Sequence, residues 1–70
     1  METTDFYVDT HNPKRLDETL NRFGAALIQE NSQDYRRVNG HYIVRCFSDP
    51  NFIKFMITNQ GYGTVIDEQD

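Results

Sequence analysis

The sequence predicts an α+β domain whose elements run strand, helix, strand, strand, helix, strand. Three observations carry this prediction. Asn12-Pro13 and Asp49-Pro50 each introduce a segment with apolar residues at helical spacing. Between these two segments, Asn39-Gly40 is typical of a two-residue hairpin turn. Segments with the composition of strands lie near both ends of the chain, at residues 5–10 and 63–69.

The first strand is predicted from alternation. Phe6 and Val8 fall on one face, whereas Asp5, Tyr7 and Asp9 fall on the other. A period of two is typical of a strand with one buried face and one exposed face.

The first helix is predicted to begin at Pro13, with Asn12 capping the free amides of its first turn. Apolar residues then recur at spacings of four, three and four, at Leu16, Leu20, Phe23 and Leu27. Gly24 leaves two alternatives for residues 25–30, a longer helix or the start of a strand. We expect the helix to continue to about Glu30.

The Asn39-Gly40 turn fixes a hairpin register. The expected opposed pairs are Val38 with His41, Arg37 with Tyr42, Arg36 with Ile43, Tyr35 with Val44, and Asp34 with Arg45. Directly opposed residues share a face of the sheet. The face with Tyr35, Arg37, Tyr42, Val44 and Cys46 is the better candidate for the core. The other face exposes Val38, Ile43 and Phe47, an apolar patch suited to a partner or to a second copy of the chain.

The second helix is predicted from Pro50, capped by Asp49, to Gly61, which suits the position after a helix end. Phe52, Ile53, Met56 and Ile57 are expected to line its buried face. Residues 63–69 complete the order. This order is the ferredoxin-like βαββαβ sandwich, an antiparallel sheet with two helices on one face and its first and last strands side by side.

The length and composition of the chain favour a binding module over an enzyme. Seventy residues form a single small domain, 1–70, with room for only a limited core and no deep pocket. We therefore expect no enzymatic activity, no cofactor and no metal site. The acidic start of the chain lacks a signal peptide, the lone Cys46 makes no internal disulfide, and no apolar run approaches ~20 residues. These features predict a cytoplasmic protein without a membrane partner.

The net charge of −4 is concentrated at the chain ends. No base opposes the acids in residues 1–9 or in residues 65–70. The predicted topology gathers these six acids, Glu2, Asp5, Asp9, Asp67, Glu68 and Asp70, on one half of the sheet. Carboxylates at alternate strand positions lie ~6.6 Å apart and could stand in for backbone phosphates. The acids either keep the protein soluble or bind a basic partner.

Direct nucleic-acid binding is not expected. Residues 34–48 combine aromatic side chains with three arginines, as RNA-binding sheets do. However, the net charge is negative, and the segment lacks the Gly-aromatic-Gly signature of such sheets. A thiol–imidazole pair of Cys46 with His11 or His41 is a third alternative, but we expect Cys46 to be buried in the core.

The run TNQGYGTVID, residues 58–67, resembles the Gly-aromatic turn that precedes the last strand of ACT-type regulatory domains. This resemblance implies a domain that binds a small ligand. The chain departs from the ACT pattern before its first helix, where Thr10-His11-Asn12-Pro13 replaces a glycine-containing turn. In size and acidity, the chain also resembles small phage-encoded host-takeover proteins, including DNA mimics.

These observations favour a non-enzymatic, acidic module that binds a basic protein. In its sharpest form, the hypothesis is an inhibitor that mimics DNA and occupies the DNA site of a host DNA-binding protein, such as the nucleoid protein HU. The alternative is an ACT-like regulatory domain that binds a small ligand.

Overall fold

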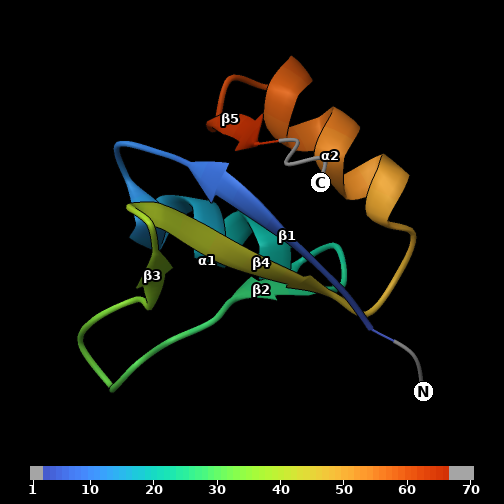
Figure 1. The fold of residues 1–70 in the computed structure, drawn as a ribbon. Coiled ribbons are helices and arrows are strands. Elements are labelled where there is room, and N and C mark those ends of the chain that lie inside the picture. Colours follow the sequence, from blue (N-terminus) through green and yellow to red (C-terminus); the bar gives the residue numbers. More distant parts are fainter. Residues whose placement is uncertain (1–2, 67–70) are drawn as a thin grey trace.

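The structure, a computed structural model, describes residues 3–66. Its seven elements are β1 (Thr4–Asp9), α1 (Pro13–Asn21), β2 (Ala25–Leu27), β3 (Arg37–Val38), β4 (His41–Cys46), α2 (Pro50–Asn59) and β5 (Thr64–Ile66). The strands form one antiparallel sheet in the order β2-β4-β1-β5, and β3 also pairs with β4 (Figure 1). An α+β domain with an antiparallel sheet and two helices is thus confirmed, although the sheet has five strands where four were expected.

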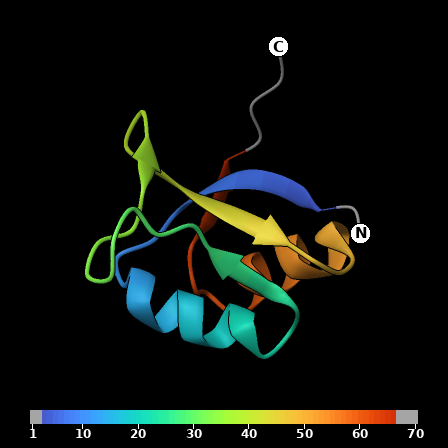
Figure 2. The same ribbon diagram turned by 90° about the horizontal axis from the view of Figure 1, so that it is seen from below.

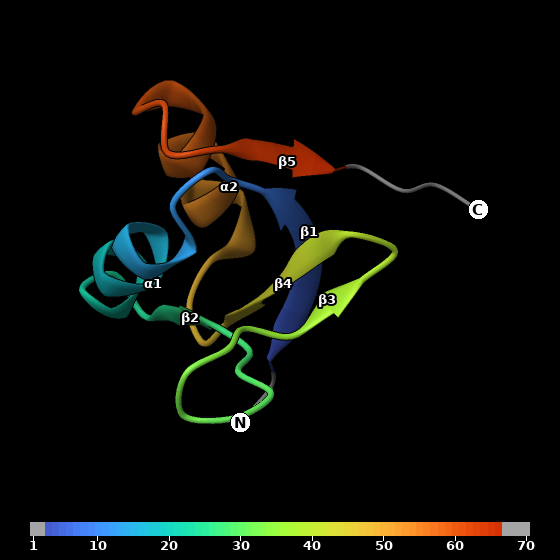
Figure 3. The same cartoon turned by 90° about the vertical axis from the view of Figure 1, so that its left-hand side faces the viewer.

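Both helices pack on one face of the sheet, as Figure 3 shows. The buried residues alternate along β1 and β4, so that Phe6, Val8, Val44 and Cys46 point toward the helices. This face of β4 is the one predicted to be buried. The core consists of eleven residues, Phe6, Val8, Leu16, Leu20, Ala25, Leu27, Val44, Cys46, Ile53, Met56 and Ile57. The opposite face of the sheet, called the open face below, has no helix over it.

The predicted continuation of the first helix to Glu30 is wrong. Helix α1 ends at Asn21, and Ala25–Leu27 form β2 instead. Gly24 has φ +85°, a conformation that glycine adopts without strain and that turns the chain out of the helix. Its carbonyl oxygen then accepts a hydrogen bond from the Phe47 amide at 2.8 Å. Leu27 fits the helical spacing of the sequence, yet it is buried as a strand residue.

The predicted starts of both helices are confirmed. The Asn12 side chain accepts a hydrogen bond from the Arg15 amide at 3.2 Å, and the Asp49 side chain accepts one from the Asn51 amide at 3.0 Å. At the end of α2, Gly61 has φ +75° and the Tyr62 amide donates to the Ile57 carbonyl at 3.1 Å. This is the Schellman arrangement, which satisfies carbonyl groups at a helix end.

The predicted buried face of α2 is correct for Ile53, Met56 and Ile57 and wrong for Phe52. The three correct residues follow the i, i+3, i+4 spacing of a single stripe that faces the sheet. Phe52 lies beside this stripe and is 49% exposed. Its ring packs against the ring of Phe23, with centroids 5.9 Å apart. Phe23, predicted to belong to the helical stripe of α1, is also largely exposed.

Strands β2 and β3 share one edge of β4. Leu27 pairs with Val44, the Ile28 amide donates to the Ile43 carbonyl at 3.0 Å, and Arg37 pairs with Tyr42. Ile28 and Arg37 thus lie opposite two consecutive residues of β4, Ile43 and Tyr42. Residues 29–36, which connect them, extend away from the sheet. We call this excursion the arm; it is the green loop of Figures 1 and 2. A bridge between Gln29 and Tyr35 closes its base.

The hairpin prediction is correct at the turn and wrong beyond it. Asn39 and Gly40 have φ +53° and +84°, as a two-residue turn of this kind requires. The two pairs nearest the turn, Val38 with His41 and Arg37 with Tyr42, have the expected register. The three further pairs, Arg36–Ile43, Tyr35–Val44 and Asp34–Arg45, do not form. Strand β2 occupies that flank of β4, because Ala25 and Leu27 bury apolar side chains there.

The last strand lies beside the first, as predicted. Tyr7 pairs with Ile66 and Val8 with Val65. The structure places β5 at Thr64–Ile66, so Gly63 of the predicted strand precedes it, and residues 67–69 lie outside the described range.

We expect Ile53→Ala to lower the free energy of unfolding by about 2–5 kcal/mol, because it leaves a cavity in the core. Phe55→Ala, also in α2, should change it by no more than about 0.5 kcal/mol, because Phe55 is 65% exposed. Urea unfolding followed by circular dichroism measures both values. Equal losses would mean that α2 packs on the sheet through a different face.

Candidate functional site

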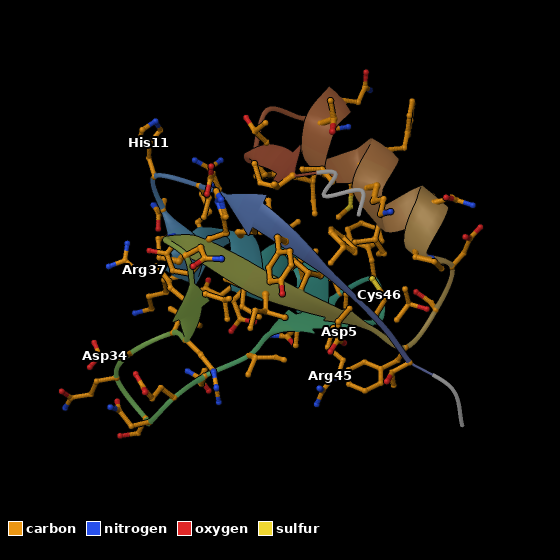
Figure 4. The ribbon with its side chains drawn as sticks, in the orientation of Figure 1. Asp5, His11, Asp34, Arg37, Arg45 and Cys46 are labelled. Carbon is orange, nitrogen blue, oxygen red and sulfur yellow. The ribbon has the colours of Figure 1, made fainter. Side chains whose placement is uncertain are left out.

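Asp5 and Asp9, two of the acids predicted to bind a partner, lie on the open face of β1. Asp5 accepts two hydrogen bonds from Arg45 of β4, from Nε to Oδ1 and from Nη2 to Oδ2, each 3.1 Å long (Figure 4). Hydrogen bonding to this carboxylate, followed by its charge, raises the pKa of the guanidinium. This pair replaces the predicted pairing of Arg45 with Asp34, which lies in the arm.

Asp9 is paired in the same way with the neighbouring strand. Its Oδ1 lies 2.6 Å from Nδ1 of His41, the first residue of β4. The imidazole also lies beside Tyr7, with ring centroids 6.4 Å apart. Both described acids of the predicted binding surface are therefore already held by a base. These pairs were not predicted from the sequence, because they depend on the register between β1 and β4.

The other four predicted partner-binding acids, Glu2, Asp67, Glu68 and Asp70, lie outside the described residues. They account for the whole excess of eleven acids over seven bases in the chain. Residues 3–66 thus contain seven acids and seven bases. With histidine neutral, the residues that the structure describes carry no net formal charge, and the excess negative charge lies in residues 1–2 and 67–70.

The open face carries a shallow groove of about 360 Å³. Tyr7, Ile28, Val38 and Ile43 form its apolar part, and the Asp5–Arg45 pair and Arg36 border it. Val38 and Ile43 were predicted to form an apolar contact patch, and both line this groove. Phe47, the third predicted residue, is 50% exposed but does not line it. Ile28 was missed because residues 25–30 were assigned to a helix.

A second hollow, about 640 Å³ in volume, lies at one end of the sheet. We call it the loop-end cavity. It is bounded by the loop from β1 to α1, by the turn between β3 and β4, and by the loop from α2 to β5. Arg15 and Arg37 both line it, and each lies over a tyrosine ring. The Arg15 guanidinium carbon is 5.8 Å from the centroid of Tyr62, and that of Arg37 is 5.4 Å from the centroid of Tyr42.

Sequence reasoning did not find the loop-end cavity, because its residues come from three distant segments. Two contacts tie the loop from β1 to α1 and the loop from α2 to β5 together. The Thr10 hydroxyl donates to the Tyr62 carbonyl at 2.8 Å, and a Cβ atom on Gly63 would lie 2.5 Å from the Asp9 carbonyl oxygen. The cavity is therefore built into the fold, since this close approach requires glycine at position 63.

Cys46 lies in the core, with 1% of its surface exposed. Burial, reinforced by the charge of Asp5, raises the pKa of its thiol. A buried, protonated thiol is a poor nucleophile. Within residues 3–66, no three histidine, cysteine, aspartate or glutamate side chains form a group suited to a metal ion. In the same range, no helix is long and apolar enough to cross a membrane.

No protein-family model, curated protein or solved structure matches the chain. The resemblances to ACT-type domains and to phage-encoded proteins therefore remain predictions.

We expect iodoacetamide at mildly alkaline pH to label Cys46 at least about tenfold more slowly in the folded protein than in urea, because labelling requires the core to open. Mass spectrometry measures the rate, and the chain has no other thiol to interfere. Equal rates would place the thiol at the surface.

The raised pKa of Cys46 also predicts a pH dependence of stability. Above the ordinary thiol value of 9.0, the unfolded chain loses this proton before the folded chain does. The free energy of unfolding should therefore fall as the pH rises past that value, and the fall should be smaller in Cys46→Ala.

Proposed function

We propose that the chain is a non-enzymatic module that binds a basic protein through the open face of its sheet and through the acids at its chain ends. The observation that carries this proposal is the antiparallel pairing of β1 with β5. Because of this pairing, the first and last strands of the described residues are neighbours in the sheet. The acids Glu2, Asp67, Glu68 and Asp70 precede β1 or follow β5 in the sequence.

The groove supports the proposal by supplying an apolar centre for the contact. Protein interfaces commonly place apolar side chains at their centre and polar groups at their rim. Tyr7, Ile43 and Ile28 lie in the row between the Asp5–Arg45 pair and the Asp9–His41 pair, and Val38 lies beside His41. The helices pack on the other face, so this surface is accessible to a partner.

The two ion pairs are compatible with a basic partner. The side chains of Asp5 and Arg45 are 42% and 46% exposed. Exposed pairs of this kind contribute little to stability, because water screens the two charges. A lysine or arginine of a partner can therefore replace Arg45 at Asp5 at little cost in free energy.

The sharper form of the proposal is DNA mimicry, in which the partner is a DNA-binding protein such as HU and the module occupies its DNA site. Asp5 and Asp9 are four positions apart on one strand, roughly 13 Å. Once bases of a partner replace Arg45 and His41, these two carboxylates present negative charges on one line along the sheet. The other charges of a phosphate-like array would come from Glu2, Asp67, Glu68 and Asp70.

We also infer that the sheet is a variant of the ferredoxin-like arrangement. The support comes from the shared edge of β2 and β3, which together act as one strand interrupted by the arm. If they are counted as one strand, the chain has the order βαββαβ, and β1 lies between β4 and β5 as that fold requires.

The test is a pull-down from nuclease-treated bacterial lysate with the tagged full chain. We expect it to recover a basic protein that elutes at moderate salt and is displaced by duplex DNA if mimicry operates. The double variant Asp67→Lys/Glu68→Lys should lose this protein. The double variant Glu18→Lys/Glu30→Lys should retain it, although it changes the net charge equally, because Glu18 lies on α1 and Glu30 in the arm.

A matched pair of variants tests the apolar part of the surface. Val38→Asn, in the groove, should weaken the captured interaction, and Phe55→Asn, on α2, should not. If both charge variants lose the partner equally, binding depends on net charge alone and the proposed surface is wrong. If neither loses it, the acidic ends only keep the protein soluble.

A further inference from the structure

We propose that the loop-end cavity binds a small organic molecule that carries a phosphate or carboxylate group, and that Arg15 and Arg37 hold this group. The proposal is independent of the protein-binding surface. The cavity lies at the end of the sheet where Figure 4 shows His11 and Arg37, and the Asp5–Arg45 pair lies toward the other end.

The size of the cavity suits a small molecule. Binding sites for such ligands commonly measure about 300–1,000 Å³, and the volume here is about 640 Å³. Two of its three bounding connections are tied together by the Thr10–Tyr62 hydrogen bond and by the close approach of Gly63 to β1, and the Asp9–His41 contact joins β1 to the start of β4 beside the third. A ligand would therefore enter a preformed site, with little loss of chain entropy.

Each of the two arginines is held in place by a tyrosine ring, and neither forms an ion pair with a described residue. Each guanidinium lies over a tyrosine ring, a contact that restrains its position while the N–H donors at its edge stay available. The described ion pairs are Asp5–Arg45 and Asp9–His41, so neither Arg15 nor Arg37 contacts a carboxylate within residues 3–66. Asp9 also lines the cavity, but its Oδ1 is held by His41.

This arrangement selects for an oxyanion. Arg15 and Arg37 bring two positive charges to the lining of one cavity, and these charges would attract an anion. The planar fork of a guanidinium matches the oxygens of a phosphate or carboxylate, and such charge-assisted hydrogen bonds are about twice as strong as neutral ones. Tyr42 and Tyr62 add aromatic surface, which suits a ligand with an organic part better than a bare ion.

The experiment is a titration of the ¹⁵N-labelled full chain, followed by NMR, with four probes. Inorganic phosphate, AMP and citrate carry oxyanions, and adenosine is the uncharged control for AMP. We expect saturable shifts at residues 9–16, 37–42 and 60–64 with AMP or citrate, and none with adenosine. A response to AMP alone would identify a phosphate ligand, whereas a response to citrate alone would identify a carboxylate ligand.

Three kinds of variant test the assigned residues. Arg15→Gln and Arg37→Gln should each weaken binding about tenfold or more, because each removes charge-assisted hydrogen bonds. Arg15→Lys and Arg37→Lys keep the charge but lose the planar fork, so they should weaken binding by an intermediate factor. Arg22→Gln removes the same charge at the end of α1, outside the cavity, and should leave the affinity unchanged.

The spectrum of each variant also reports whether it is folded, so a loss of binding is distinguished from a loss of structure. The proposal is overturned if no oxyanion probe binds saturably at millimolar concentrations. It is also overturned if Arg22→Gln weakens binding as much as Arg15→Gln or Arg37→Gln, because binding would then follow net charge and not the cavity.

Discussion

The fold depends on the pairing of β4 with three other strands. On one flank, β1 pairs along most of its length, and on the other flank β2 and β3 divide the edge between them. Two local signals fix this division. The Asn39-Gly40 turn sets β3 against the start of β4, and the left-handed conformation of Gly24 directs Ala25 to its end. Between these two anchors the chain has eight residues more than the edge requires, and these form the arm.

One carboxylate contacts both β2 and the arm. Asp17 of α1 accepts a hydrogen bond from the Leu27 amide at 2.9 Å, and the Tyr35 hydroxyl donates to its other oxygen at 3.4 Å. Burial, followed by the charge of Asp17, raises the pKa of Tyr35. The Tyr35 ring also packs edge-on against Tyr42, the residue that lies under the Arg37 guanidinium. The base of the arm therefore helps to position one wall of the loop-end cavity.

The same sheet separates two surfaces of different chemistry. The open face combines an apolar groove with two paired aspartates, and we propose that it binds a large, basic partner. The loop-end cavity is bounded by loops and lined by two arginines, and we propose that it binds a small anion. Residues 3–66 contain equal numbers of acidic and basic side chains, so they produce no strong overall electrostatic field. The local charges at each surface can therefore determine which ligand it attracts.

The sequence alone determined the features that depend on neighbouring residues. Both helix starts, the hairpin turn and the end of α2 follow from Asx-Pro, Asn-Gly and Gly signals, each of which acts within a few residues. The alternation of Phe6 and Val8 likewise identified the buried face of β1. The proximity of the first and last strands followed from the order of the elements.

Tertiary structure decided the features that depend on competition between segments. Leu27 satisfies both a helical stripe and a buried strand, and only the free edge of β4 selected the strand. The pairing of Asp5 with Arg45, and the meeting of Arg15 and Arg37 at one cavity, join residues that no local pattern relates. A sequence pattern indicates which secondary structure a segment prefers locally. Which other segment it pairs with depends on which apolar side chains the completed core can bury.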